Sequence, residues 1–168
     1  MSAVTDVGFL EMRVAKVVGF HQDELTFEYV VLDEVSGAQH LVIQIGSAEG
    51  FLLAASLQGM HWPRPMTYDF AAALLRGVGG RVRRVLLDRV LDGAYAATVE
   101  VDGPLGAARV DARCSDALNL AVLEHAPVLV SPEMLADAEA RSEGDSADAR
   151  FARRAPDAAP MTIMREPA

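Results

Sequence analysis

The sequence predicts an α+β domain with a mixed, largely antiparallel sheet, built from a hairpin and a three-strand meander and packed with about four helices. Three observations lead to this fold class: valine-rich segments indicate strands, turn signals connect those strands, and capped apolar segments between them indicate helices. The length of 168 residues suits one ordinary domain. With 51% hydrophobic and 23% charged residues, the composition is typical of a globular protein.

The N-terminal part is predicted to contain three strands. Valine enrichment favours a strand over residues 11–20. Residues 26–32 and 39–45 follow as two further strands, and the Ser36-Gly37 turn signal between them predicts a hairpin.

The next segment predicts two helices separated by a break. Ser47 is expected to cap the first helix, with Glu49 in its first turn, where a carboxylate meets the positive end of the helix dipole. Two prolines within residues 61–65 exclude a helix there. Thr67 is then expected to cap the second helix, with Asp69 in its first turn.

The second half predicts an antiparallel meander followed by two helices. Its strands are expected at residues 81–91, 94–101 and 107–112, because an Asp-Gly pair stands in each connection. Ser115 is expected to cap a third helix. After a short strand, Ser131 followed by a proline predicts the start of a fourth helix.

The composition divides the chain into a folded domain at residues 1–140 and a low-complexity tail at residues 141–168. Small, charged and proline residues dominate the tail without a periodic apolar face, so we expect it to be flexible. Phe151 and residues 161–164 are the parts of it that could dock on the domain. The tail has five basic and five acidic residues, so residues 1–140 carry the whole net charge of −9. An acidic domain opposes tight non-specific binding of nucleic acid but leaves room for a local basic site.

Cysteine content and hydropathy predict a cytoplasmic protein. Cys114 is the single cysteine, which excludes an intramolecular disulfide and fits a reducing compartment. Residues 1–8 lack the basic and long apolar stretches of a signal peptide. No apolar run approaches the roughly 18–20 residues of a transmembrane helix, so we expect no membrane association.

Several common kinds of site are disfavoured. The four histidines show no zinc-binding spacing. The glycine-rich residues 77–80 join a helix to a strand, whereas a phosphate-binding loop leads into a helix. Cys114 stands near a helix start, where a thiol can be reactive, but a small buried filler is the favoured interpretation.

Three polar clusters remain, at residues 46–49, 64–69 and 111–116, each at a predicted helix start. Helix capping and pairing of arginines with acids explain them structurally, and this interpretation is favoured on the residues alone. A functional interpretation is also coherent. Helix N-termini and arginines bind phosphate, and carboxylates can hold Mg²⁺ for phosphodiester hydrolysis.

Six ordered motifs lie between Val30 and Leu135: VVLDE at 30–34, IGSAE at 45–49, RPMTYD at 64–69, DG at 92–93, DARCSDA at 111–117 and APVLVSPEML at 126–135. At these motifs the chain resembles the bifunctional nuclease family. The resemblance implies a mixed α+β fold, a homo-oligomer and nuclease activity on DNA and RNA.

The chain departs from the family pattern at three positions. The family usually has histidine where Tyr68 stands, proline where Cys114 stands and alanine where Gly50 stands. A tyrosine with an ordinary pKa near 10 is a poor replacement for a proton-transferring imidazole at neutral pH. The departure therefore bears on catalysis rather than on the fold.

Eight residues match the family motifs and are expected to converge. Our hypothesis gives the carboxylates a catalytic or metal-holding role and the other four a substrate-binding role; the first group is Glu49, Asp69, Asp111 and Asp116, and the second is Arg64, Thr67, Arg113 and Ser115. The alternatives are a non-catalytic oligomeric scaffold or regulator, and a protein that binds a small anion between helix N-termini.

Overall fold

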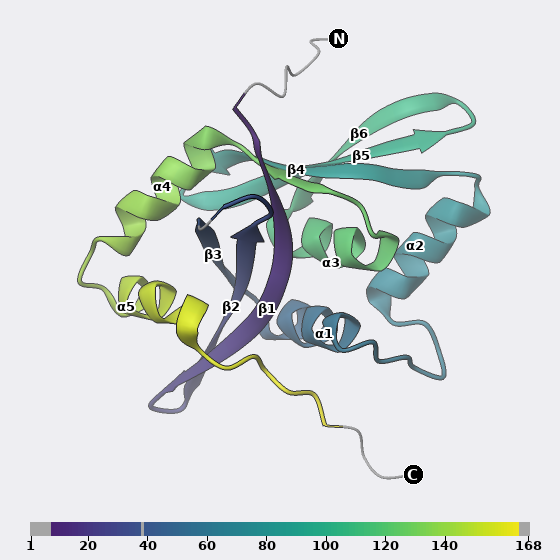
Figure 1. Ribbon diagram of the computed structural model, residues 1–168. Helices are drawn as coiled ribbons and strands as arrows, with labels where there is room; N and C mark the ends of the chain where they lie inside the picture. The colour runs from purple at the N-terminus through teal and green to yellow at the C-terminus, as the bar shows by residue number, and fades with distance from the viewer. Residues whose placement is uncertain (1–7, 38, 165–168) are drawn as a thin grey trace.

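The computed structural model describes residues 8–37 and 39–164, which form one seven-stranded sheet and five α-helices (Figure 1). The strands are β1 Leu10–Gln22, β2 Leu25–Glu34, β3 His40–Ile45, β4 Arg81–Leu91, β5 Ala94–Gly103, β6 Gly106–Arg113 and β7 Val128–Val130. The helices are α1 Ser47–Leu57, α2 Thr67–Gly77, α3 Cys114–Glu124, α4 Pro132–Ser142 and α5 Ala147–Arg154, followed by a short 3₁₀ helix at Ala155–Asp157. The mixed α+β class is confirmed.

The sheet joins two antiparallel units through the short strand β7. Its strand order is β3-β2-β1-β7-β4-β5-β6. Both the predicted β2–β3 hairpin and the β4–β5–β6 meander are present. Strand β7 pairs antiparallel with β1 and parallel with β4. A strand that follows α3 in the sequence therefore lies between two strands that precede α3.

The main core lies between one face of the sheet and helices α1 and α3. Leu53 of α1 and Leu118 of α3 are fully buried, and they pack with strand residues such as Val30 and Leu87. Burial of each such side chain stabilises the fold by roughly 1.5–3 kcal/mol. This core places the starts of α1 and α3 side by side, directly after the ends of β3 and β6.

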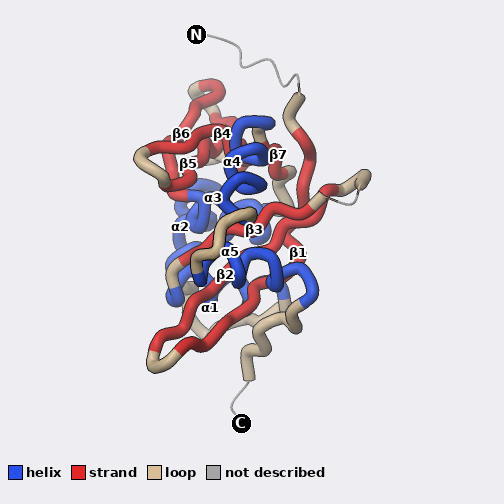
Figure 2. Tube along the Cα trace, turned by 90° about the vertical axis from the view of Figure 1, so that its left-hand side faces the viewer, coloured by secondary structure: helices blue, strands red, loops and turns tan. Residues whose placement is uncertain are grey.

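The expectation of a flexible tail is wrong for residues 147–157, which are helical and packed on the second face of β1 and β2. Phe151 of α5 stacks on Phe20, with ring centroids 4.9 Å apart and an interplanar angle of 8°. The Tyr29 hydroxyl donates a hydrogen bond of 2.5 Å to Asp148. Figure 2 shows α5 lying across this part of the sheet. The division into a domain at 1–140 and a tail at 141–168 stays a prediction.

The physical reason for the packed tail lies in β1 and β2 rather than in the tail itself. Val18, Phe20, Tyr29 and Val31 alternate with residues of the main core and would be exposed without a second layer. A strand that is buried on both faces reads as a continuous apolar run. The run Tyr29–Leu32 carries that signal, and α5 supplies the cover.

Three expected helix caps are wrong by one or two residues. Gly46, Met66 and Arg113 occupy the N-cap positions of α1, α2 and α3, instead of Ser47, Thr67 and Ser115. At α1 and α3 the residue that leaves the preceding strand is still extended, so it takes the cap position itself. Ser131 is confirmed as the cap of α4, since its hydroxyl accepts a 3.2 Å hydrogen bond from the amide of Met134.

Residues 1–7, for which the sequence predicted no signal peptide, lie outside the described residues. None of the helices within residues 8–37 and 39–164 has the length and apolarity needed to cross a membrane.

Candidate functional site

An arginine at the junction of β6 and α3 forms the centre of the candidate site. The Arg113 guanidinium donates from Nε to Asp116 at 2.7 Å and from Nη2 to Asp116 at 2.9 Å. The same Nη2 donates to Glu49 of α1 at 2.8 Å. The Arg113 side chain remains 67% exposed, and within the described residues its Nη1 makes no hydrogen bond. The cluster therefore keeps free donors that face solvent.

A third segment enters the cluster through Tyr68 of α2. The Tyr68 hydroxyl donates a 2.6 Å hydrogen bond to Asp116. Burial and the charge of Asp116 raise the pKa of Tyr68, so the phenol keeps its proton and remains a donor at neutral pH. Burial alone would raise the pKa of Asp116, but hydrogen bonds from Arg113 and Tyr68 outweigh it and lower that pKa. Asp116 is therefore a fixed anion that orients Arg113.

A buried amide holds the two helix starts together. Asn119 of α3 is fully buried, and its Nδ2 donates to the backbone oxygens of Ser115 at 2.9 Å and Glu49 at 3.2 Å. This contact fixes α1 against α3 at the level of the charged cluster. Neither the polar motifs nor their spacing pointed to Asn119, because its role depends on the packing of two helices distant in sequence.

Sequence reasoning also missed a buried acid beneath the start of α1. Glu28 of β2 is 8% exposed, and its Oε2 has no hydrogen-bond partner within the described residues. Burial first, and then the charge of Glu49, raise the pKa of Glu28, although a hydrogen bond with Ser47 acts in the opposite direction. An acid inside the apolar strand TFEYVVL was the signal that could have identified it.

The structure brings together only part of the predicted set. Glu49, Arg113 and Asp116 meet, and Ser115 is buried beside them at the start of α3. Asp111 instead pairs with Arg89 at 2.8 Å.

The remaining predicted residues lie around α2. Asp69 turns back to accept a 3.0 Å hydrogen bond from the backbone amide of Met66. Thr67 is exposed at the start of the helix. Arg64 is exposed and makes no hydrogen bond or ion pair within the described part of the chain. The expected convergence therefore fails for Asp69 and Asp111, and the assigned roles of all eight residues stay predictions.

The carboxylates do not form a metal-binding cluster by themselves. Among residues 8–37 and 39–164, no group of three or more His, Cys, Asp or Glu side chains is placed to hold a metal ion. Glu49 and Asp116 supply two carboxylates, and both are directed at Arg113. Because both carboxylates are engaged by Arg113, no chemical step is assigned to a divalent cation.

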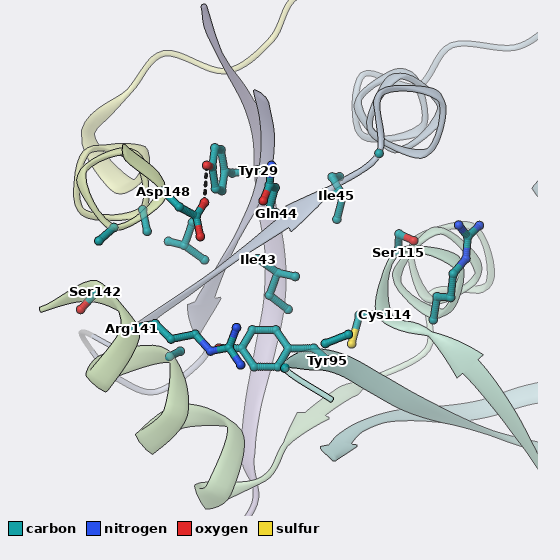
Figure 3. A pocket seen from close by; sticks show the side chains of 18 residues that line it. Tyr29, Ile43, Gln44, Ile45, Tyr95, Cys114, Ser115, Arg141, Ser142 and Asp148 are labelled. Atoms are coloured by element: carbon teal, nitrogen blue, oxygen red, sulfur yellow. Dashed lines mark hydrogen bonds between the residues drawn. The ribbon is translucent and has the colours of Figure 1, made fainter. Parts of the chain in front are cut away.

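A cavity of about 550 Å³ adjoins the cluster on the side of β3 and α5. Arg113 and Ser115 belong to its wall, and so do Tyr95, Arg141 and Asp148 (Figure 3). Cys114 lines the same wall, and burial raises the pKa of its thiol to about 12, which disfavours a reactive thiolate at neutral pH. Through Arg113, the charged cluster therefore borders a partly open cavity.

The comparison with known protein families matches the bifunctional nuclease domain over residues 30–143, which includes every segment of the cluster. The chain belongs to the bifunctional nuclease domain family. Two relatives from Mycobacterium tuberculosis, the uncharacterized protein MT1877 of strain CDC 1551 / Oshkosh and the uncharacterized protein Rv1829 of strain ATCC 25618 / H37Rv, are each 30% identical over 128 residues. The alignment covers 76% of this chain and 76% of each relative. Family membership supports a nuclease-like function, and α5 lies beyond the matched region.

Proposed function

We propose that this protein hydrolyses phosphodiester bonds of DNA or RNA at the Arg113 cluster, defined as Glu49, Tyr68, Arg113 and Asp116. The observation that carries the proposal is the convergence of three distant chain segments on one exposed arginine with free donors. Membership of the bifunctional nuclease domain family supports the same reaction class.

The geometry suggests a separate role for each group. Arg113 binds the phosphate through its free Nη1 and stabilises the charge that develops on the phosphoryl oxygens. Asp116 and Tyr68 hold the guanidinium in place. Glu49 accepts a proton from the attacking water, whose oxygen forms the new bond to phosphorus while the ester bond breaks. Ser115 and Thr67 lie at helix starts on either side of this group and are kept as substrate-binding candidates.

Hydrolysis of a labelled single-stranded oligonucleotide by Arg113→Ala tests the proposal. Loss of one charged donor to a developing oxyanion reduces the rate by about 10²–10³-fold. Arg109→Ala is the matched control, because within the described residues the ion pairs of Arg109 are with Asp88 and Glu100 of the meander and not with the Arg113 cluster. Equal activity of wild type and Arg113→Ala would refute the site assignment.

A non-catalytic, homo-oligomeric scaffold is the second candidate, and one observation favours an oligomer. Phe70 and Leu74 of α2 and Val78 at its C-cap recur every four residues and are 56%, 55% and 71% exposed. An exposed apolar stripe of this kind supports burial against a second copy of the chain. Light scattering of Leu74→Glu, compared with wild type, tests this: a smaller particle is expected, and an unchanged mass excludes α2 as the interface.

We also keep the cytoplasm as the proposed location. Cys114 is 3% exposed, and an isolated buried thiol suits a reducing compartment. Fractionation of cells that express the tagged chain tests this directly, and recovery outside the cytoplasm would contradict it.

A further inference from the structure

The cavity beside the Arg113 cluster has the size and lining of a small-molecule site. Its volume of about 550 Å³ lies within the roughly 300–1,000 Å³ of pockets that enclose small ligands. The floor is apolar and includes Ile43 and Ile45 of β3. Helix α4, which the family match covers, and helix α5, which lies beyond it, close the side opposite the cluster. The tail helix therefore supplies one wall of a partly open cavity beside strand β3.

The cavity lining contains two arginines, although the whole chain carries a net charge of −9. Arg113, Arg141 and Asp148 are the charged residues of the lining. Each arginine is paired with acids outside the lining, Arg113 with Glu49 and Asp116 and Arg141 with Asp137, and both guanidinium side chains remain partly exposed. Recognition of an anionic group therefore depends on direct hydrogen bonds from these arginines and not on a net positive charge.

Two facing walls could hold a planar ring. On one wall the Arg141 guanidinium lies 5.0 Å from the centroid of the Tyr95 ring, and its Nε is fixed by a 2.5 Å hydrogen bond to Asp137. On the other wall Tyr29 donates to one oxygen of Asp148, and the second oxygen of that carboxylate accepts no hydrogen bond within the described residues. Figure 3 shows these pairs across the cavity from one another, with Gln44 beside the second wall. Guanidinium planes stack on nucleobases, and carboxylate and amide groups read their edges.

We propose that this cavity binds one unstacked nucleotide of a single-stranded substrate, with the base between the Arg141–Tyr95 and Tyr29–Asp148 walls and the phosphate at Arg113. The proposal rests on the proposed hydrolase function and specifies its substrate. A base that is stacked inside a duplex cannot enter a cavity of this kind without being extruded, which costs free energy. Single strands, loops and frayed ends are therefore preferred over a blunt duplex.

Binding of adenosine 5′-monophosphate and of ribose 5-phosphate to the full chain, measured by titration calorimetry, tests the cavity without requiring turnover. Stacking of a base is worth about 1–3 kcal/mol, so the nucleotide is expected to bind at least about tenfold more tightly than the sugar phosphate. Ala94→Trp places an indole at an exposed position of the cavity wall and is expected to raise the dissociation constant of the nucleotide about tenfold or more. Ala107→Trp is the matched control, since Ala107 is also an exposed strand alanine and lies outside the cavity lining.

The outcomes separate this proposal from the proposed function. Equal affinity for the two ligands, or unchanged nucleotide binding by Ala94→Trp, would overturn the cavity assignment even if the protein cleaves nucleic acid. Selective nucleotide binding that Ala94→Trp abolishes would support the cavity even if no hydrolysis is found. Arg141→Gln provides a second variant, and its circular dichroism spectrum shows whether a loss of binding reflects a loss of fold.

Discussion

The Arg113 cluster and the charged face of the β4–β5–β6 meander contain the same kinds of residues, but they are assembled differently. On the meander, Asp88 accepts from Arg89 at 3.0 Å and from Thr98 at 2.8 Å, and Arg89 also pairs with Asp111. All of these residues come from three consecutive strands. In the Arg113 cluster, the interacting side chains come from α1, α2 and the junction of β6 and α3. These segments are distant in the sequence and meet only when the whole domain is folded.

The two regions differ in how far apart in the sequence their paired charges lie. The meander network requires only that three consecutive strands pair in the correct register. Its acids Asp88, Glu100 and Asp111 each contact an arginine. The Arg113 cluster joins distant segments at the mouth of a cavity and leaves Arg113 donors free within the described residues. Pairing of charges and a neighbouring cavity do not distinguish the two regions, since the meander network also lines a cavity of about 520 Å³. The Arg113 cluster differs in that it joins three segments distant in the sequence.

The largest expected effect contrasts one carboxylate from each region. Glu49→Gln removes the proposed proton acceptor without changing its shape, and hydrolysis of a single-stranded oligonucleotide is expected to fall by about 10²–10⁴-fold. Asp111→Asn makes the same chemical change in the meander network, where the carboxylate contacts Arg89, and activity is expected to persist. Loss of activity in both variants, at equal folded protein, would show that the two regions are not functionally distinct.

Stability should show the opposite order. Asp88 has a side chain that is only 12% exposed, so Asp88→Ala leaves nearby hydrogen-bond donors buried without their acceptor and is expected to cost about 2 kcal/mol. Asp116→Ala breaks an ion pair with the largely exposed Arg113 and removes the acceptor of the Tyr68 hydroxyl, and is expected to cost about 1 kcal/mol. Urea denaturation of both variants measures the difference. A larger loss in Asp116→Ala would mean that the Arg113 cluster is mainly structural.

Tyr68→Phe tests whether the hydrogen bond from Tyr68 to Asp116 is needed to position Arg113 for hydrolysis. The variant loses one hydrogen bond to Asp116, worth about 1 kcal/mol, so a reduction in hydrolysis of up to about tenfold is expected. The pKa of Asp116 is lowered in the folded protein, so its stabilising effect is present above the ordinary carboxyl pKa and is lost as the pH falls through the lowered value. Tyr68→Phe should therefore be most destabilised at neutral pH and approach wild type in acid. A destabilisation that is independent of pH would indicate lost packing only.

The sequence predicted much of the fold because local signals were consistent with the sheet. Asp-Gly turns, alternating valines and the Ser131-Pro132 start each act over a few residues, so the meander and α4 were found at nearly the right bounds. Helix α5 was missed because its own segment is polar and small. The residues that need α5 as cover are Phe20 and Tyr29, which are distant from it in the sequence and would be exposed without it.

The site was predicted less completely for a related reason. Motifs identified Glu49, Arg113 and Asp116, which stand at helix starts beside one another. The same motifs included Asp111, and only the pairing of β5 with both β4 and β6 shows that Arg89 is its partner. Burial decided the role of Glu28, and burial is a property of the assembled fold.

The smallest expected effect concerns Glu28, which lies next to Glu49 of the Arg113 cluster but makes no ion pair with Arg113. Its folded-state pKa is raised, so the folded chain holds a proton that the unfolded chain releases first, and stability falls as the pH rises from the ordinary carboxyl pKa to the raised value. Glu28→Gln removes this penalty, so its stability relative to wild type should improve between acid and neutral pH. The exposed Glu24→Gln serves as the control for loss of one formal charge. Thermal unfolding of wild type, Glu28→Gln and Glu24→Gln across this pH range measures the difference. If the stability of Glu28→Gln relative to wild type instead declines with rising pH, the fold stabilises the buried carboxylate as an anion. Glu28 would then resemble the paired acids of the meander.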